Sequence, residues 1–224
     1  FDTSKEDVKA VIEKLKTGNV RDESIKLTFI EGKSIIDYAK VITDKTDNSM
    51  EDVFDLLKNE EYINSLIEKY WFITDEIKNE DIYYCLYSYL IPDSYIFENQ
   101  SVSVETIINS ILDYTDKLLT EYRDAVENSG YTVHQILTLA SIIEKEASMN
   151  EDMPEIAGVF YNRLNSNMSL GSDVTTYYAF QVDMATSDLS TEQINTYNPY
   201  NTRGPNMNGK LPVGPICNPS EEAI

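Results

Sequence analysis

One carboxylate, Glu144, lies in a segment suited to acid catalysis. Residues 137–147 read Leu-Thr-Leu-Ala-Ser-Ile-Ile-Glu-Lys-Glu-Ala, a mainly apolar run with helical periodicity. On a helix, the neighbours of Glu144 three, four and seven positions away are small or apolar: Leu137, Ala140, Ser141, Ala147 and Ser148. A carboxyl group withdrawn from water holds its proton more readily, as a general acid requires. Small residues, among them Ala140 and Ala147, would keep a pocket open beside an acid at Glu144. The pattern alone favours the alternative, a salt-bridged Glu on an ordinary helix.

Glu146 has comparable surroundings, so helical spacing alone does not choose between the two carboxylates. Its neighbours at the same spacings are apolar: Leu139, Ile142, Ile143 and Met149. Lys145 differs, because it shares a polar stripe with His134, Thr138 and Ser141, and we predict that its side chain is solvated.

Neutral polar and aromatic residues follow on segments that Pro and Gly stiffen. They occupy 170–175, 177–178, 198–202 and 211–219. Sugar hydroxyls need paired donors and acceptors, and sugar ring faces pack on aromatic rings. These segments predict a carbohydrate ligand, although the same residue types also serve as plain turn residues.

Composition excludes several classes of function. The chain has 224 residues and a formal net charge of −21, which disfavours binding to nucleic acid or to an anionic membrane surface. Two cysteines and one histidine nearly exclude a zinc site, and no metal or other cofactor is predicted. We interpret Cys85 and Cys217 as small hydrophobic residues. Two alternatives stay open: a nucleophile formed by a cysteine with the histidine, and a disulfide between the two cysteines. No apolar run is long enough to span a bilayer, and a chain beginning at Phe1 is interpreted as a trimmed piece.

The elements expected to position these groups indicate an α+β fold. Thr132 and Gln135 form a capping-box pattern that begins the helix carrying Glu144, and Gly130 ends the long helix before it. Residues 165–219 are predicted to form loops and short strands. A half-buried strand is predicted at 25–30, and helices at 4–16, 34–43, 50–57, 61–70 and 104–128, then from 132 and from 154.

Five ordered motifs resemble those of the YceG-like (MltG) family of endolytic murein transglycosylases. They are Leu-Ala-Ser-Ile-Ile-Glu-Lys-Glu (139–146), Gly-Val-Phe-Tyr-Asn-Arg-Leu (158–164), Ser-Asp (172–173), Tyr-Asn-Thr (200–202) and Gly-Pro-Ile-Cys-Asn-Pro (214–219). Upstream, 89–95 is similar to a further family motif. The resemblance implies a LysM-like α/β module with connecting helices at 1–78. It also implies a catalytic domain of helices and short strands at 79–224, truncated at its C-terminus.

The resemblance implies cleavage of the β-1,4 bond between N-acetylmuramic acid and N-acetylglucosamine. One Glu protonates the glycosidic oxygen and then takes the proton of the muramoyl C6 hydroxyl, which closes a 1,6-anhydro ring. An internal nucleophile removes the need for a second carboxylate. On this match Glu144 is the catalytic residue, and the substrate-binding residues are Ser141, Glu146, Asn162, Arg163, Ser172, Asp173, Thr175, Tyr178, Tyr200, Asn201, Thr202 and Asn218.

The chain also departs from the family pattern in its loops. The family usually carries other residues at Gly171, Val174, Arg203, Val213 and Ser220, and Gly is common at the last of these. The implied partners are peptidoglycan strands and a membrane peptidoglycan synthase complex. The implied location is the outer side of a Gram-positive cell membrane, with an anchoring helix before Phe1.

Two other functions stay open. One is a weakly active or inactive glycan-binding scaffold in a cell-wall complex. The other is a glycosidase that uses water, with Glu144 as the acid and Asp173 as its partner.

Overall fold

The computed structural model describes residues 23–224, so the helix expected at 4–16 lies outside the described residues. The strands are β1 (Ile25–Thr28) and β2 (Ser94–Phe97). The helices are α2 (Ile35–Lys45), α3 (Met50–Lys58), α4 (Glu60–Lys69), α5 (Val104–Glu121), α6 (Arg123–Ser129), α7 (Val133–Glu146), α8 (Met153–Asn165), α9 (Asp173–Ala179) and α10 (Thr191–Asn195), with 3-10 turns η1 (Asp75–Lys78) and η2 (Asn150–Asp152). This mixture of helices with one small sheet confirms the α+β class.

Helix starts follow local capping chemistry. Ser34 begins α2 by accepting the backbone N–H of Asp37, whose carboxylate accepts the backbone N–H of Ser34 in return. Thr132 and Gln135 form the same reciprocal pair at the start of α7, which confirms the predicted capping box. Because each pair satisfies amide groups that a helix end leaves unpaired, these starts are fixed by neighbouring residues alone.

The sheet joins two distant parts of the chain. β1 pairs antiparallel with β2, with Ile25 opposite Phe97 and Thr28 opposite Ser94. The predicted strand at 25–30 is confirmed, whereas β2 was not predicted. Because β1 precedes residue 78 and β2 follows it, the pairing crosses the expected domain boundary. The division at 78 and the LysM-like identity of the first part stay predictions.

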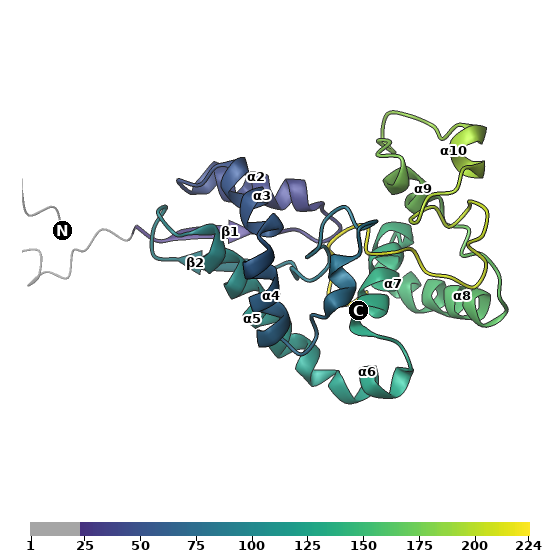
Figure 1. Ribbon diagram of the computed structural model, residues 1–224, viewed down its shortest axis with the longest axis horizontal. Helices are drawn as coiled ribbons and strands as arrows, with labels where there is room; N and C mark the ends of the chain where they lie inside the picture. The colour runs from purple at the N-terminus through teal and green to yellow at the C-terminus, as the bar shows by residue number, and fades with distance from the viewer. Residues whose placement is uncertain (1–22) are drawn as a thin grey trace, which may run out of the picture.

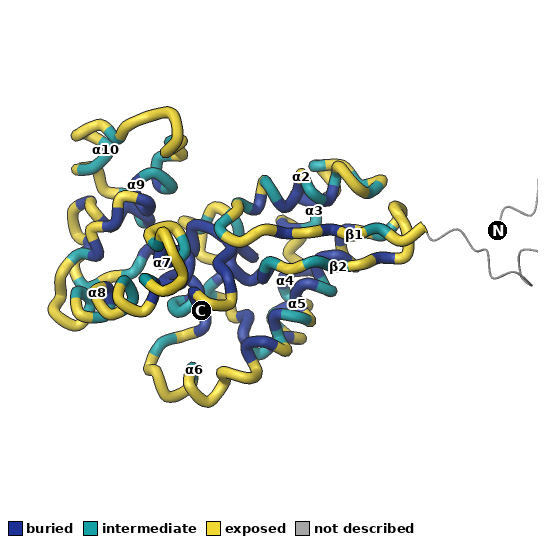
Figure 2. The backbone as a smooth tube through the Cα atoms, turned by 180° about the vertical axis from the view of Figure 1, so that it is seen from behind, coloured by how far each residue is buried: buried dark blue, intermediate teal, exposed yellow. Residues whose placement is uncertain are grey.

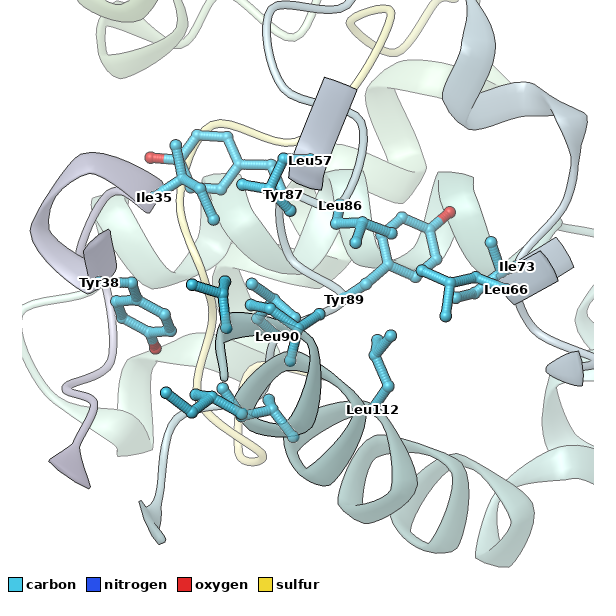
Figure 3. Close-up of a cluster of buried hydrophobic side chains, with 14 of the residues drawn as sticks. Ile35, Tyr38, Leu57, Leu66, Ile73, Leu86, Tyr87, Tyr89, Leu90 and Leu112 are labelled. Carbon is cyan, nitrogen blue, oxygen red and sulfur yellow. The ribbon is translucent and has the colours of Figure 1, made fainter. Parts of the chain in front are cut away.

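The first hydrophobic core lies between the sheet and helices α2 to α5. Figure 3 shows side chains from α2, from 86–90 and from α5 gathered in it, among them Tyr38, Tyr89 and Leu112, all at most 2% exposed. A second core forms among α7, α8, α9 and the C-terminal segment. Figure 1 shows the two groups of elements on either side of the molecule, with the C-terminal segment returning to the centre.

Helix α7 takes part in both cores. Val133 and Leu137 pack in the first, and Leu139 and Ile143 pack in the second. This accounts for an apolar surface that runs most of the way around the helix. The final turn, which carries Glu144, is thereby fixed relative to both groups of elements.

Two predictions about the elements are wrong. The long helix at 104–128 is interrupted at Tyr122, because the apolar stripe ends at Leu119 and α6 has no buried residue (Figure 2). Gly130 does end α6, in the left-handed conformation expected of it (φ +78°). Among the described residues of 165–219 there are no short strands; turns and helices α9 and α10 stand in their place.

Candidate functional site

Glu144 is half-buried in the last turn of α7, and one of its carboxylate oxygens is firmly held. Its Oε2 accepts a hydrogen bond from the backbone N–H of Ser220 (3.0 Å) and another from the Ser220 hydroxyl (2.6 Å). The described residues form no hydrogen bond to Oε1. The carboxylate therefore has a fixed orientation and one oxygen available to a ligand.

Glu144 opens onto a cleft of about 570 Å³. One wall is the turn after β1 and the start of α2, and the other is α9 with the turn that follows it. The lining residues are Glu31, Gly32, Lys33, Ser34, Ile36, Asp37, Tyr84, Tyr87, Glu144, Lys145, Val174, Tyr177, Tyr178, Gln181, Val182, Met184 and Ile216. Parts of the chain far apart in sequence thus meet around a single carboxylate on α7.

Gly32 forms the wall next to Oε1. Its φ of +68° lies in the left-handed region, and a Cβ placed on it would lie 3.5 Å from Oε1 of Glu144. The Gly32 N–H donates to the carbonyl of Asn218 (2.8 Å), and Nζ of Lys145 donates to the Gly32 carbonyl (3.4 Å). The turn is therefore tied to both the C-terminal segment and α7.

The other ionisable groups of the cleft have mixed charge. Glu31 and Asp37 bring negative charge, and Lys33 and Lys145 bring positive charge. Partial burial acts to raise the pKa of Asp37, but the hydrogen bonds from Ser34 and the nearby lysines outweigh it and lower the pKa. Asp37 is thus an ionised residue of the α2 cap.

The surroundings predicted for Glu144 need correction. Ala140 is buried in the second core, and neither Ala140 nor Ala147 lines the cleft, so these alanines do not keep it open. Lys145 is exposed, which confirms the prediction that it is solvated, although the other residues of its stripe, His134, Thr138 and Ser141, are buried. His134 is hydrogen-bonded on both ring nitrogens, to the Tyr89 hydroxyl and the Val213 carbonyl.

Glu146 faces a different hollow from Glu144. It is exposed and accepts a hydrogen bond from the Ser172 hydroxyl (2.5 Å). Both residues line a hollow of about 410 Å³ that also contains Arg163, whose guanidinium donates to the Leu170 carbonyl. The structure thus separates the two carboxylates that helical spacing could not distinguish.

Three of the predicted substrate-binding residues form a buried polar network beneath α9. The hydroxyl of Thr175 donates to the Ser172 carbonyl (2.7 Å) and lies 2.8 Å from that of Thr202. The side chain of Asn201 accepts from Thr176 (2.7 Å) and donates to the Thr196 carbonyl (2.8 Å). Because Thr175, Thr202 and Asn201 are fully buried, their visible role is to hold the start of α9, and direct sugar contact stays a prediction for them.

Asn218 and Ser141 connect segments in a similar way. Oδ1 of Asn218 accepts the backbone N–H of Ser88 (2.9 Å), and its amide donates to the Lys33 carbonyl (3.3 Å). The Ser141 hydroxyl accepts the backbone N–H of Ile216 (3.0 Å). Both residues are fully buried, and together they fix the segment 216–220 that delivers Ser220 to Glu144.

The remaining predicted residues are dispersed. Tyr178 lines the cleft and packs edge-on against the buried Tyr200, with ring centroids 4.8 Å apart. Asp173 forms an ion pair with Arg203 and does not line the cleft. Asn162 is exposed on α8 and lines neither hollow. The role of each in substrate binding stays a prediction.

Sequence reasoning missed Gly32, Lys33, Tyr87 and Ser220. Of these residues, Ser220 alone carried a signal, as a departure from the family pattern. Their convergence on Glu144 depends on contacts between residues far apart in the sequence, 76 positions for Ser220 and 112 for Gly32, which no local pattern encodes.

Further features concern metals, thiols and membranes. Within residues 23–224, no group of three His, Cys, Asp or Glu side chains is placed to hold a metal ion. Both Cys85 and Cys217 are free thiols. In the same part of the chain no helix has the length and apolar character needed to cross a bilayer.

Comparison with known families matches residues 3–224 to the YceG-like family. The chain belongs to the YceG-like family. It is 33% identical over 213 residues to the endolytic murein transglycosylase of Bacillus subtilis (strain 168), an alignment covering 95% of this chain and 58% of that protein. It is 34% identical over 174 residues to the endolytic murein transglycosylase of Streptococcus pneumoniae serotype 2 (strain D39 / NCTC 7466), covering 75% of this chain and 31% of that protein.

A solved structure also resembles this YceG-like chain. The crystal structure of a YceG-like protein from Listeria monocytogenes superposes with a TM-score of 0.82 at 32% sequence identity, covering 98% of this chain and 71% of that one. The fold is therefore that of a family member along nearly its whole described length. The chain nevertheless spans under two thirds of the length of the two named transglycosylases.

Proposed function

We propose that this chain is the catalytic part of an endolytic murein transglycosylase and that Glu144 is its acid and base. The observation that carries the proposal is the carboxylate of α7 at the cleft. Its Oε2 is held by Ser220, and its Oε1 has no hydrogen-bond partner among residues 23–224. The names of the Bacillus and Streptococcus relatives support the reaction type.

The proposed reaction needs one group that gives a proton and later takes one back. Protonated Glu144 donates to the glycosidic oxygen as the bond from C1 of muramic acid to that oxygen breaks. The carboxylate then accepts the proton of the C6 hydroxyl while O6 bonds to C1. The substrate carries its own nucleophile, so no water is consumed and no metal or organic cofactor is required.

The geometry favours this reaction over hydrolysis with Asp173. Asp173 is paired with Arg203 and does not line the cleft. Of the other cleft carboxylates, Asp37 is engaged in the α2 cap, and Glu31 is the remaining one that could activate a water. Product analysis distinguishes the two reactions, because hydrolysis leaves a reducing end and transglycosylation leaves an anhydro end.

The cleft also suits a glycan strand. Tyr84, Tyr87, Tyr177 and Tyr178 supply ring faces and hydroxyls, and Ser34 and Gln181 supply further polar groups. A cleft rather than an enclosed cavity admits a polymer that continues in both directions, as an endolytic cut requires.

The wider setting belongs to the same proposal. We propose peptidoglycan strands as the substrate and a membrane peptidoglycan synthase complex as a partner, with the region outside the membrane of a Gram-positive cell. We also propose a LysM-like module at 1–78 and a catalytic domain at 79–224. The names of the relatives support peptidoglycan as the substrate, and the other parts of this setting rest on the resemblance to the family.

Digestion of peptidoglycan tests the reaction. The wild-type chain is expected to release fragments with 1,6-anhydro-muramic ends, identified by mass spectrometry, and Glu144→Gln to release none. Glu105→Gln is a matched control, since Glu105 is exposed on α5 and does not line the cleft. Reducing ends would instead indicate hydrolysis. A folded wild-type chain that binds glycan but releases nothing would indicate the scaffold function.

A further inference from the structure

The two oxygens of the Glu144 carboxylate have different environments. Oε2 is the acceptor of two hydrogen bonds from one residue, Ser220. Oε1 lies beside Gly32, and the Cα of Gly32 carries only hydrogen on the side where a Cβ would approach Oε1. A backbone N–H can only donate, so Oε2 remains an acceptor in both protonation states of Glu144.

From this asymmetry we propose that Oε1 is the oxygen that transfers the proton and that Ser220 is a positioning residue for it. The proposal rests on the proposed function of Glu144. Ser220 is 5% exposed, so it binds the carboxylate from the protein side and leaves the cleft side to the substrate. It acts through Glu144 and does not need to touch the sugar.

The position of Ser220 is itself fixed by its neighbours. Asn218, two residues earlier, is held by Ser88 and Lys33. Ala223, three residues later, is buried in the second core. Because the segment is anchored on both sides of Ser220, its N–H and hydroxyl are preorganised toward Oε2.

The proton balance assigns one role to each oxygen. In the first step the Oε1–H bond breaks, the glycosidic oxygen gains the proton, and its bond to C1 breaks, so that it leaves as a hydroxyl. The carboxylate that remains has its charge stabilised by the two hydrogen bonds at Oε2. In the second step the C6 hydroxyl loses its proton to Oε1, O6 bonds to C1, and the enzyme returns to its starting state. Ser220 neither gains nor loses a proton over the cycle.

Two measurements test the proposal on Ser220→Ala and Ser220→Gly, which remove the hydroxyl and keep the N–H. The first is the kinetics of anhydro-end release. We expect kcat to fall about tenfold, equivalent to about 1.4 kcal/mol, with KM changed less than twofold. Ser110→Ala is the control, because the half-buried Ser110 donates to a carbonyl of its own helix (2.7 Å), and it should match the wild type. Full kcat in both Ser220 variants, or a change confined to KM, would overturn the proposal.

The second measurement does not depend on activity. The ¹³C signal of the Glu144 carboxyl, assigned by its loss in Glu144→Gln, is followed against pH by NMR. Removing a donor to a carboxylate favours the protonated form, so the midpoint should move to higher pH in Ser220→Ala, by about one pH unit for a tenfold change in proton affinity. An unchanged midpoint would overturn the proposal.

The other ionisable groups around Glu144 are the same in the wild type and the variant, so they do not produce the difference. They are Glu31, Lys33, Asp37, Tyr84, Tyr87, Lys145, Tyr177, Tyr178 and Cys217. If the wild-type chain releases no anhydro ends, the proposed function fails while the NMR titration still decides the role of Ser220. If it releases them and Ser220→Ala behaves as the wild type in both measurements, only the inference about Ser220 fails.

Discussion

Replacing Gly32 with Ala tests whether the turn after β1 forms part of the catalytic cleft. The added Cβ would lie 3.5 Å from Oε1 and 3.7 Å from Cγ of Glu144, which is ordinary van der Waals contact. The methyl group therefore fits, but it occupies space next to Oε1, the oxygen that we propose transfers the proton. A substrate oxygen must come within about 2.6–3.2 Å of that atom, so the methyl group competes with it.

The stability cost follows from the backbone. Gly32 has φ +68°, and an L-residue in this region costs roughly 1–2 kcal/mol. For a chain of this size, that corresponds to a fall in Tm of about 2–8 °C. Gly130 is a matched control, because its φ is +78° and a Cβ there has nothing within 4 Å.

Both variants are measured by thermal unfolding and by release of anhydro ends at a temperature where each is folded. We expect similar falls in Tm, and a loss of at least about tenfold in kcat/KM for Gly32→Ala alone, equivalent to about 1.4 kcal/mol. Equal activity of the two variants would refute the assignment of Gly32 to the cleft. A much larger fall in Tm for Gly32→Ala would show that the methyl group does not fit as the geometry indicates.

Three further outcomes are expected. Asn218→Ala should destabilise the fold by about 2–4 kcal/mol in urea unfolding, because it leaves the Ser88 N–H without its partner, whereas the exposed Asn162→Ala should change stability by less than about 0.5 kcal/mol. Comparable losses would show that the Asn218 contacts are unimportant. Asp173→Asn should still release anhydro ends and lose at most about 1 kcal/mol of stability, since its ion pair with Arg203 is exposed; loss of all products would revive the glycosidase that uses water. Burial raises the pKa of the Cys85 thiol from 9.0 to about 11, so the unfolded chain releases this proton first and stability should fall as pH rises from 9 to 11. The fall should be smaller in Cys85→Ala, and equal slopes would contradict the cause.

The sequence was most informative where structure is local. The start of α7 at Thr132 and the stop at Gly130 were predicted because a capping box and a left-handed Gly act within a few residues. The break at Tyr122 was missed, since an apolar stripe indicates where a helix packs and not whether it stays straight beyond its last buried residue.

For the site as well, the sequence predicted the local feature and not the long-range contacts. Glu144 was singled out from its helix pattern and from the family motifs, and the structure places it at a cleft. Its surroundings were not predicted, because Gly32 and Ser220 reach it from opposite parts of the chain. Thr175 and Thr202 show a similar limit: the structure adds that both are buried with their hydroxyls toward each other, and their contact with a sugar stays a prediction.

The link between the turn after β1 and Asn218 has a consequence for the order of folding. It closes a loop of 185 residues, and contacts of such sequence separation form slowly because the chain entropy is lost before the contact forms. During synthesis or export, the first core has nearly all of its residues once position 137 has emerged, but the cleft must wait for residues 216–220. The chain is thus expected to form its first core before the cleft around Glu144 is complete.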